Sequence, residues 1–187
     1  MPVPADIGVG PGADCLAALE AYAPADSTQV DLRRQFLAHL ARHPDDGWSR
    51  TCPGAHLTAS GLICSPDADQ VLLLHHRKLG RWLQVGGHIE PTDTTLAGAA
   101  YREALEESGL PVRLIPGIVH LDSHEVPCGP VRSCFHLDVR YLLVADPRLA
   151  PVTGDESHSV RWFPHDALPT DESSVTVLVD IARSILV

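Results

Sequence analysis

The sequence predicts an α+β fold in which a mixed β-sheet carries helices on both faces. Two observations lead to this class. Apolar segments typical of strands mix with helical segments, without the strict alternation that a parallel sheet requires. Of 187 residues, 44% are hydrophobic and 20% are charged, which suits a globular chain with a sizeable core.

The chain divides into an N-terminal helical extension, residues 1–50, and a main domain, residues 51–187. Helices are predicted at 14–22 and 27–42, followed by a link rich in proline and glycine at 43–54. The extension has three open interpretations. It could shape substrate access, form a homodimer contact, or cover the sheet.

Short apolar segments in the main domain predict strands, with a Pro-Asp-Ala-Asp turn at 66–69 separating the first two. These segments are 56–65, 70–76, 82–85, 112–124, 134–145 and 160–164. An amphipathic helix at 173–186 ends the chain. The residues expected to face inward are Val175, Leu178, Val179, Ala182, Ile185 and Leu186.

The net charge of -10, from 14 Lys+Arg against 24 Asp+Glu, argues against binding to nucleic acid polymers or anionic membranes. It still permits a small phosphorylated substrate, because a bound cation reverses the local charge. No apolar run approaches the ~20 residues of a membrane span, and the N-terminus lacks a secretory signal pattern. We therefore expect a cytoplasmic protein.

Five cysteines, an odd number without framework spacing, predict reduced thiols rather than a disulfide scaffold. Cys52, His56 and Cys64 were considered as zinc ligands, but their spacing matches no familiar zinc-binding pattern.

The most informative segment places charged residues on a predicted helix shortly after Gly86 and Gly87. Glu103, Glu106 and Glu107 share one helical face, and so repel one another. Their pKa values rise unless a cation lies between them. Mg²⁺ prefers carboxylate oxygens and would relieve the repulsion. The alternative interpretation is a solvated acidic face.

The whole segment, GGHIEPTDTTLAGAAYREALEESGL at 86–110, resembles the Nudix box, G-x5-E-x7-R-E-U-x-E-E-x-G-U, where U is aliphatic. Residues on its fixed positions are Gly87, Arg102, Glu103, Ala104, Glu106, Glu107, Gly109 and Leu110. This resemblance implies the Nudix fold, an α/β/α sandwich with a curved mixed β-sheet.

One position departs from the box. Five residues after Gly87 stands Asp93 instead of glutamate, and eight residues rather than seven separate it from Arg102. We interpret this as a one-residue insertion with a shorter acid, and Glu90 could share the role. Whether Glu90 or Asp93 contacts metal or braces Arg102 stays open.

The resemblance implies an Mg²⁺-dependent hydrolase, with Mn²⁺ as an alternative ion, that cleaves a pyrophosphate linkage in a nucleoside-diphosphate-type substrate. Glu103, Glu106 and Glu107 would hold the metal, and Arg102 would assist them. A carboxylate must accept a proton from the attacking water. The candidates are Glu107, Glu103 and the later Glu156. The alternative interpretation of Glu156 is an exposed acidic residue in a loop, without a catalytic role.

Several further residues are candidates for substrate binding. They are Gly86, Gly87, His88, Arg77, Arg81, Glu90, His120 and His124. The alternative interpretation of the basic turn at 75–78 is an exposed surface turn that does not contact the substrate. The alternating pattern of His120, Asp122 and His124 places all three on one strand face, and 136–140 repeats it. This patch is either a second metal site or, as we favour, a polar sheet surface without metal.

Two other functions are consistent with the same resemblance. A Nudix-like domain could bind a nucleotide or sugar nucleotide without cleaving it, although such domains usually lack box glutamates that are present here. A relative of isopentenyl diphosphate isomerase would need a catalytic cysteine, and Cys64 reads better as a buried apolar residue.

Overall fold

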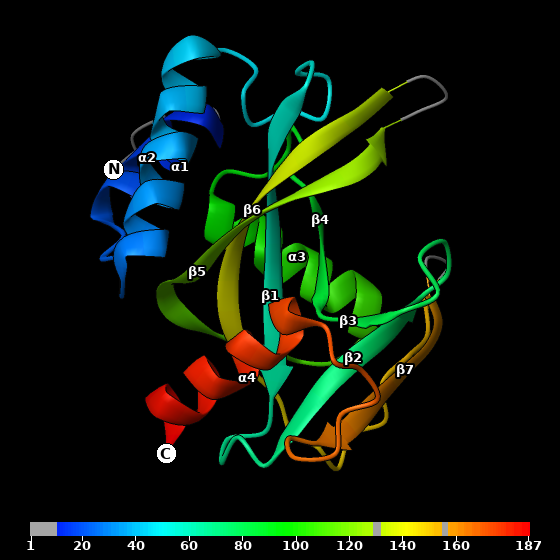
Figure 1. Cartoon of the computed structure of the whole chain (residues 1–187). Helices are drawn as coiled ribbons and strands as arrows, with labels where there is room; N and C mark the ends of the chain where they lie inside the picture. Colours follow the sequence, from blue (N-terminus) through cyan, green and yellow to red (C-terminus); the bar gives the residue numbers. More distant parts are fainter. Residues whose placement is uncertain (1–10, 129–131, 155–156) are drawn as a thin grey trace, which may run out of the picture.

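The computed structural model describes residues 11–128, 132–154 and 157–187, and in them seven strands form one mixed sheet with helices on both faces (Figure 1). The helices are α1 (Pro11–Ala21), α2 (Ser27–Arg42), α3 (Leu96–Ser108) and α4 (Ser173–Leu186). The strands are β1 (Ala55–Cys64), β2 (Gln70–His76), β3 (Trp82–Leu83), β4 (Val85–His88), β5 (Arg113–Cys128), β6 (Arg132–Val144) and β7 (Ser157–Pro164). The predicted α+β sandwich is confirmed.

Strand β1 lies at the centre of the sheet and has several partners. The main path runs β3-β2-β1-β6-β5, while β4 pairs with β1 and β7 pairs with β2. Strands β1 and β6 run parallel, and the other pairs among the described residues are antiparallel. The segment Thr58–Gly61 of β1 pairs with β4, whereas Ile63 and Cys64 pair with β2. This division places the glycines of β4 beside the middle of β1.

The two faces of the sheet are covered by different helices. Leu57 and Ala59 of β1 belong to a buried cluster that includes residues of α1, α2 and α3. Leu62 and Cys64 point the opposite way and pack against α4. This alternation follows from the period of two along a strand. In Figure 1, α3 lies behind the sheet and α4 in front of it.

The N-terminal helices are integrated into the core of the sheet domain. Leu19 of α1 and Phe36 of α2 are fully buried and pack in the same cluster as Leu121 and Leu137 of β5 and β6. Helix α2 has the predicted bounds, and the Asp26 side chain caps it by accepting a hydrogen bond from the Gln29 backbone at 2.9 Å. Covering the sheet is thus one role that the extension fills.

Two sequence expectations are wrong in detail. Ile185 of α4 was expected to face inward but is 48% exposed. Cys15, Cys52 and Cys64 are free, but Cys134 is disulfide-bonded, so the prediction of five reduced thiols fails. Within the described ranges, no helix has the length and apolar character needed to cross a membrane.

Candidate active site

Two glycines let β4 approach both its neighbouring strand and helix α3. Gly86 has φ of +152°, and a Cβ there would lie 2.3 Å from the Cβ of Ser60. A Cβ on Gly87 would lie 2.6 Å from a carboxylate oxygen of Glu103. A side chain at Gly86 would push against the backbone of β1, and one at Gly87 would displace the Glu103 carboxylate.

The carboxylates of α3 lie against this glycine loop. The backbone N–H of Gly86 donates to Oε2 of Glu107 at 2.8 Å. Glu103 contacts Gly87, and its side chain is only 14% exposed, whereas that of Glu106 is 58% exposed. The three glutamates thus extend from the buried loop to the molecular surface along one side of the helix.

Arg102 is the main partner of these acids. Its Nη1 donates to Glu103 at 2.9 Å and to Glu106 at 3.1 Å. Its Nε and Nη2 donate to the two carboxylate oxygens of Asp93 at 3.0 and 2.9 Å. Nη2 also donates to the carbonyl of His88 at 2.9 Å. One guanidinium therefore pairs with three carboxylates, which reduces their mutual repulsion but leaves the cluster with a net negative charge.

The structure shows which of the two loop acids, Glu90 or Asp93, contacts Arg102. Burial alone would raise the pKa of Asp93, but the hydrogen bonds from Arg102 and from the Glu90 backbone hold that pKa below its usual value. The same bonds to Asp93 and Glu103 raise the pKa of Arg102. Glu90 itself is exposed. Asp93 thus braces Arg102 from the loop, in the place where the box has glutamate.

Helix α3 is fixed at both ends. Thr95 caps its start by accepting from the N–H of Gly98 at 2.8 Å, and Gly109 ends it with φ of +64°. A second cap comes from α1, where Asp14 accepts from the N–H of Leu96 at 2.7 Å. The role of Asp14 is not predictable from local sequence, because this contact joins residues far apart in the chain.

The donor chemistry of α3 fits a divalent cation. Glu103 and Glu106 both reach Nη1 of Arg102, which shows that their carboxylates converge on one cationic group. Carboxylate oxygens are the ligands that Mg²⁺ and Mn²⁺ prefer. Among the described residues, the groups that bring three His, Cys, Asp or Glu ligand atoms within 4.8 Å of one another are His56 with Cys134 and His136, and His43 with Asp46 and Cys52, so a cation would have to draw the α3 carboxylates closer together.

The predicted basic candidates Arg77 and Arg81 lie in the turn between β2 and β3 and have partners. Arg77 donates to the Ser157 carbonyl at 3.2 Å, and Arg81 pairs with Glu172 at 3.0 Å. The general-base candidate Glu156 lies outside the described residues. These positions therefore stay as predictions.

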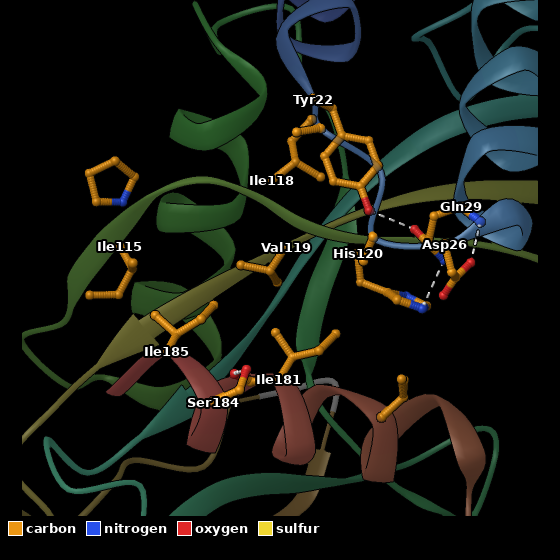
Figure 2. Close-up of a pocket in the computed structure, with 14 residues that line it drawn as sticks. Tyr22, Asp26, Gln29, Ile115, Ile118, Val119, His120, Ile181, Ser184 and Ile185 are labelled. Atoms are coloured by element: carbon orange, nitrogen blue, oxygen red, sulfur yellow. Dashed lines mark hydrogen bonds between the residues drawn. The ribbon is translucent and has the colours of Figure 1, made fainter. Parts of the chain in front are cut away.

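His120 lines a cavity of about 450 Å³ between the start of α2, β5 and α4 (Figure 2). Its walls are largely apolar, and at one end Gln29 contacts Nε2 of His120 at 3.0 Å and accepts from the Tyr22 hydroxyl at 2.8 Å. Burial, followed by the nearby Arg140, lowers the pKa of His120. None of the described lining residues belongs to the Nudix-like segment, so His120 and the glutamates are not brought together.

A buried polar network covers part of the sheet face opposite α3. Asp138 accepts from Thr58 at 3.0 Å, from Ser60 at 2.7 Å and from Arg140 at 2.8 Å. Arg140 is 1% exposed and also pairs with Asp122. Asp122 in turn contacts His124 at 2.7 Å. Four residues of the alternating pattern, Asp122, His124, Asp138 and Arg140, are thus paired with one another, and Asp138 and Arg140 are buried.

Comparison with known proteins identifies the class of this arrangement. The family model described as the NUDIX domain matches residues 54–179, more than half of the chain. No curated protein matches.

Solved structures of this class share the fold. A NUDIX family hydrolase from Clostridium perfringens is 24% identical, with a TM-score of 0.53 over 70% of this chain and 97% of that chain. An Ap4A hydrolase from C. elegans is 16% identical, with a TM-score of 0.54 over 70% and 96%. An ADP-ribose pyrophosphatase from Streptococcus suis is 19% identical, with a TM-score of 0.50 over 68% and 90%.

Proposed function

Because the chain belongs to the Nudix hydrolase superfamily, we propose that it cleaves a pyrophosphate linkage in a small nucleoside-diphosphate-type substrate with the help of Mg²⁺ or Mn²⁺. The observation that carries this proposal is the contact of the α3 glutamates with the glycine loop. It brings a cluster of hard oxygen donors together with the partly exposed backbone of Gly86 and Gly87. The Ap4A hydrolase and ADP-ribose pyrophosphatase that share the fold support this substrate class.

In this proposal Glu103, Glu106 and Glu107 hold the cation. When bound, it offsets negative charge on phosphate oxygens and lowers the pKa of a coordinated water. Glu107 accepts the Gly86 N–H, so this carboxylate is held at a fixed position beside the loop. Glu107, Glu103 and Glu156 are the alternative proton acceptors for the attacking water.

Arg102 positions the acids. Its bonds to Asp93 and the His88 carbonyl use Nε and Nη2, while Nη1 alone reaches Glu103 and Glu106. The anchor to the loop is thus separate from the contact to the glutamates. These loop bonds could hold Arg102 in place if the two glutamates were bound to a cation instead.

The remaining candidates form the proposed surroundings of the substrate. Gly86 and Gly87 lie against Glu107 and Glu103, so a phosphate bound at these glutamates through the cation would lie near both glycines, and His88 and Glu90 follow along the chain. Arg77, Arg81, His120 and His124 lie elsewhere on the sheet and would contact more distant parts of the substrate.

The direct test measures phosphate release from nucleotide sugars, dinucleoside polyphosphates, NADH, CoA and nucleoside triphosphates, with Mg²⁺, with Mn²⁺ and with EDTA. We expect metal-dependent hydrolysis of at least one compound. The variant Glu106→Gln with Glu107→Gln should lower turnover by at least about 100-fold, because the metal-binding oxygens are lost. The matched control, Glu20→Gln with Glu125→Gln, changes exposed glutamates outside the segment and should retain activity. Unchanged turnover in the first variant would reject the proposal.

One observation favours a second candidate, a binding domain that does not hydrolyse its ligand. Arg102 pairs through Nη1 with both Glu103 and Glu106, so two of the three proposed metal ligands already have a cationic partner within the chain. Tight binding of a panel compound in EDTA, with no turnover under any condition, would favour this alternative.

A further inference from the structure

Three histidines from three neighbouring strands gather on the sheet face opposite α3. His56 pairs in register with His136 of the parallel strand β6, and Thr58, two residues along β1, pairs with His88 of β4. The ring centroids of His56 and His136 are 4.9 Å apart, those of His56 and His88 are 5.1 Å apart, and those of His88 and His136 are 5.2 Å apart.

His56 is the residue that needs an explanation. It is 2% exposed, and neither of its ring nitrogens has a hydrogen-bond partner among the described residues. A neutral imidazole has one donor and one acceptor, and burying either without a partner costs about 1–3 kcal/mol. The sheet therefore buries a costly polar group beside two further imidazoles.

We propose that His56, His88 and His136 form a binding site for a divalent transition metal such as Zn²⁺, separate from the carboxylates of α3. Imidazole nitrogen suits zinc and related ions, whereas Mg²⁺ prefers oxygen. The two sites lie on opposite faces of β4, because Gly87 contacts Glu103 while His88 points the other way.

The spacing of the rings fits such an ion. Three imidazoles bound to a tetrahedral zinc through Zn–N bonds of about 2.0–2.1 Å have ring centroids about 5 Å apart. One nitrogen each of His56 and His136 already lies within 4.8 Å of the other. His88 does not belong to that group of ligand atoms, and the proposal requires its partly exposed ring, whose centroid lies 5.1 and 5.2 Å from those of His56 and His136, to turn a nitrogen towards them.

The protonation state also suits a ligand role. Burial lowers the pKa of His56 to about 4 and that of His136 to about 3, and the neighbouring histidines lower both further. Both rings are thus neutral at pH 7, the form that binds metal.

Cys134 is the fourth group at this place. Its Sγ lies within 4.8 Å of nitrogens of His56 and His136, but it is disulfide-bonded and is not a thiolate. The proposal therefore assigns it no bond to the metal. If a dithiol or phosphine reductant opens the disulfide, the freed thiolate adds a stronger ligand.

The test uses the full chain with Glu106→Gln and Glu107→Gln, which removes two of the three α3 carboxylates and so weakens binding of zinc there, after treatment with a chelator. Titration with Zn²⁺ should show one bound equivalent and a higher melting temperature, because the ion binds the folded chain and joins three strands. Absence of binding would overturn the proposal. Binding that occurs only with reductant would also overturn it, because the imidazoles alone would then be insufficient.

Ligand assignment needs single substitutions in the same background. His88→Gln and His136→Gln should each weaken zinc affinity by at least about 100-fold, more than the loss of an outer-shell partner does. The control is His158→Gln, which changes an exposed histidine of β7 in a similar ring pair with His75. Equal affinity in all three variants would reject the site.

A further measurement keeps all the histidines in place, so its result does not depend on whether a histidine variant folds. NMR of the imidazole nitrogens should show zinc-dependent shifts confined to His56, His88 and His136. A second group, His43, Asp46 and Cys52, also brings three ligand atoms within 4.8 Å. Zinc-dependent shifts of His43 instead of His56 would place the metal at this second group and contradict the proposal. The proposal would also fail if zinc left the signals of His56, His88 and His136 unchanged and His56 were hydrogen-bonded only to water.

Discussion

The ion pair between Asp93 and Arg102 controls the charge balance of the candidate site. The Asp93 side chain is 6% exposed and accepts two hydrogen bonds from the guanidinium. Water therefore does not easily take the place of either partner in this pair. The shorter acid therefore performs the bracing role from within an altered loop. Its removal would leave Arg102 attached to the loop only through the His88 carbonyl.

We expect Asp93→Asn to destabilise the fold by about 2–4 kcal/mol, because it breaks a largely buried ion pair. Urea unfolding at pH 7 measures this. The matched control is Asp31→Asn, whose 71% exposed side chain pairs with Arg34 at the surface and should matter little. Equal losses in the two variants would contradict the assigned role of Asp93.

The same pair makes a prediction about pH. Because the folded chain lowers the pKa of Asp93, this carboxylate stabilises the fold above its unfolded pKa of about 3.9, and the contribution disappears as pH falls through the lower folded value. The unfolding free energy of the wild type should therefore fall more steeply than that of Asp93→Asn between about pH 5 and pH 2. Parallel profiles would refute the linkage.

Gly86 is a position where one methyl group should be decisive. Its Cβ would lie 2.3 Å from the Ser60 Cβ, so Gly86→Ala must separate β4 from β1. We expect a loss of at least about 3 kcal/mol and of hydrolytic activity. Gly80→Ala is the control, because Gly80 also has positive φ, +64°, but a Cβ there meets nothing within 4 Å. Only about 1 kcal/mol of strain is expected at that position.

At the scale of elements, α3 depends on a residue of the extension. Asp14 of α1 caps the first turn of α3, where a negative charge also complements the helix dipole. We expect Asp14→Ala to destabilise the chain by about 1 kcal/mol in thermal unfolding and to lower activity. If Asp14→Ala increased hydrogen exchange only in α1, and the α3 amides were as protected as in the wild type, the capping role of Asp14 would be contradicted. Asp31→Ala, on an exposed face of α2, is the control.

Local patterns account for the elements that were predicted well. Helix α2 begins at Ser27 with Asp26 as its cap, and α4 covers residues 173–186, because caps and periodicity are encoded within a few residues. The arrangement of Glu103, Glu106 and Glu107 on one face of α3 follows from the same period. Local reasoning was therefore sufficient for the helix that carries the site.

Long-range contacts account for what was missed. The choice between Asp93 and Glu90 depended on which carboxylate reaches Arg102 across the loop. The approach of His56 to His88 and His136 depends on the order β4-β1-β6. Strand order is a property of the whole sheet, and no periodicity within one strand reports it.

At the scale of the molecule, the sheet domain and the N-terminal helices share one core. Residues 54–179 match the family, yet Phe36 lies outside this range and is fully buried among residues of the sheet. We therefore propose that the boundary drawn at residue 50 separates regions of sequence but not units of folding.

Phe36→Ala tests this directly. The cavity should cost about 3–5 kcal/mol and lower the stability of the whole chain in one transition, because the lost contacts join α2 to the sheet. Far-UV circular dichroism and the fluorescence of Trp162, kept as the only tryptophan by replacing Trp48 and Trp82 with Phe, should report the same midpoint. Leu16→Ala, at a position 42% exposed, should shift that midpoint little. If α2 unfolded before the Trp162 signal changed, the N-terminal extension would be a separate folding unit. Its apolar contacts with β5 and β6 would then be too weak to make the extension and the sheet domain unfold together.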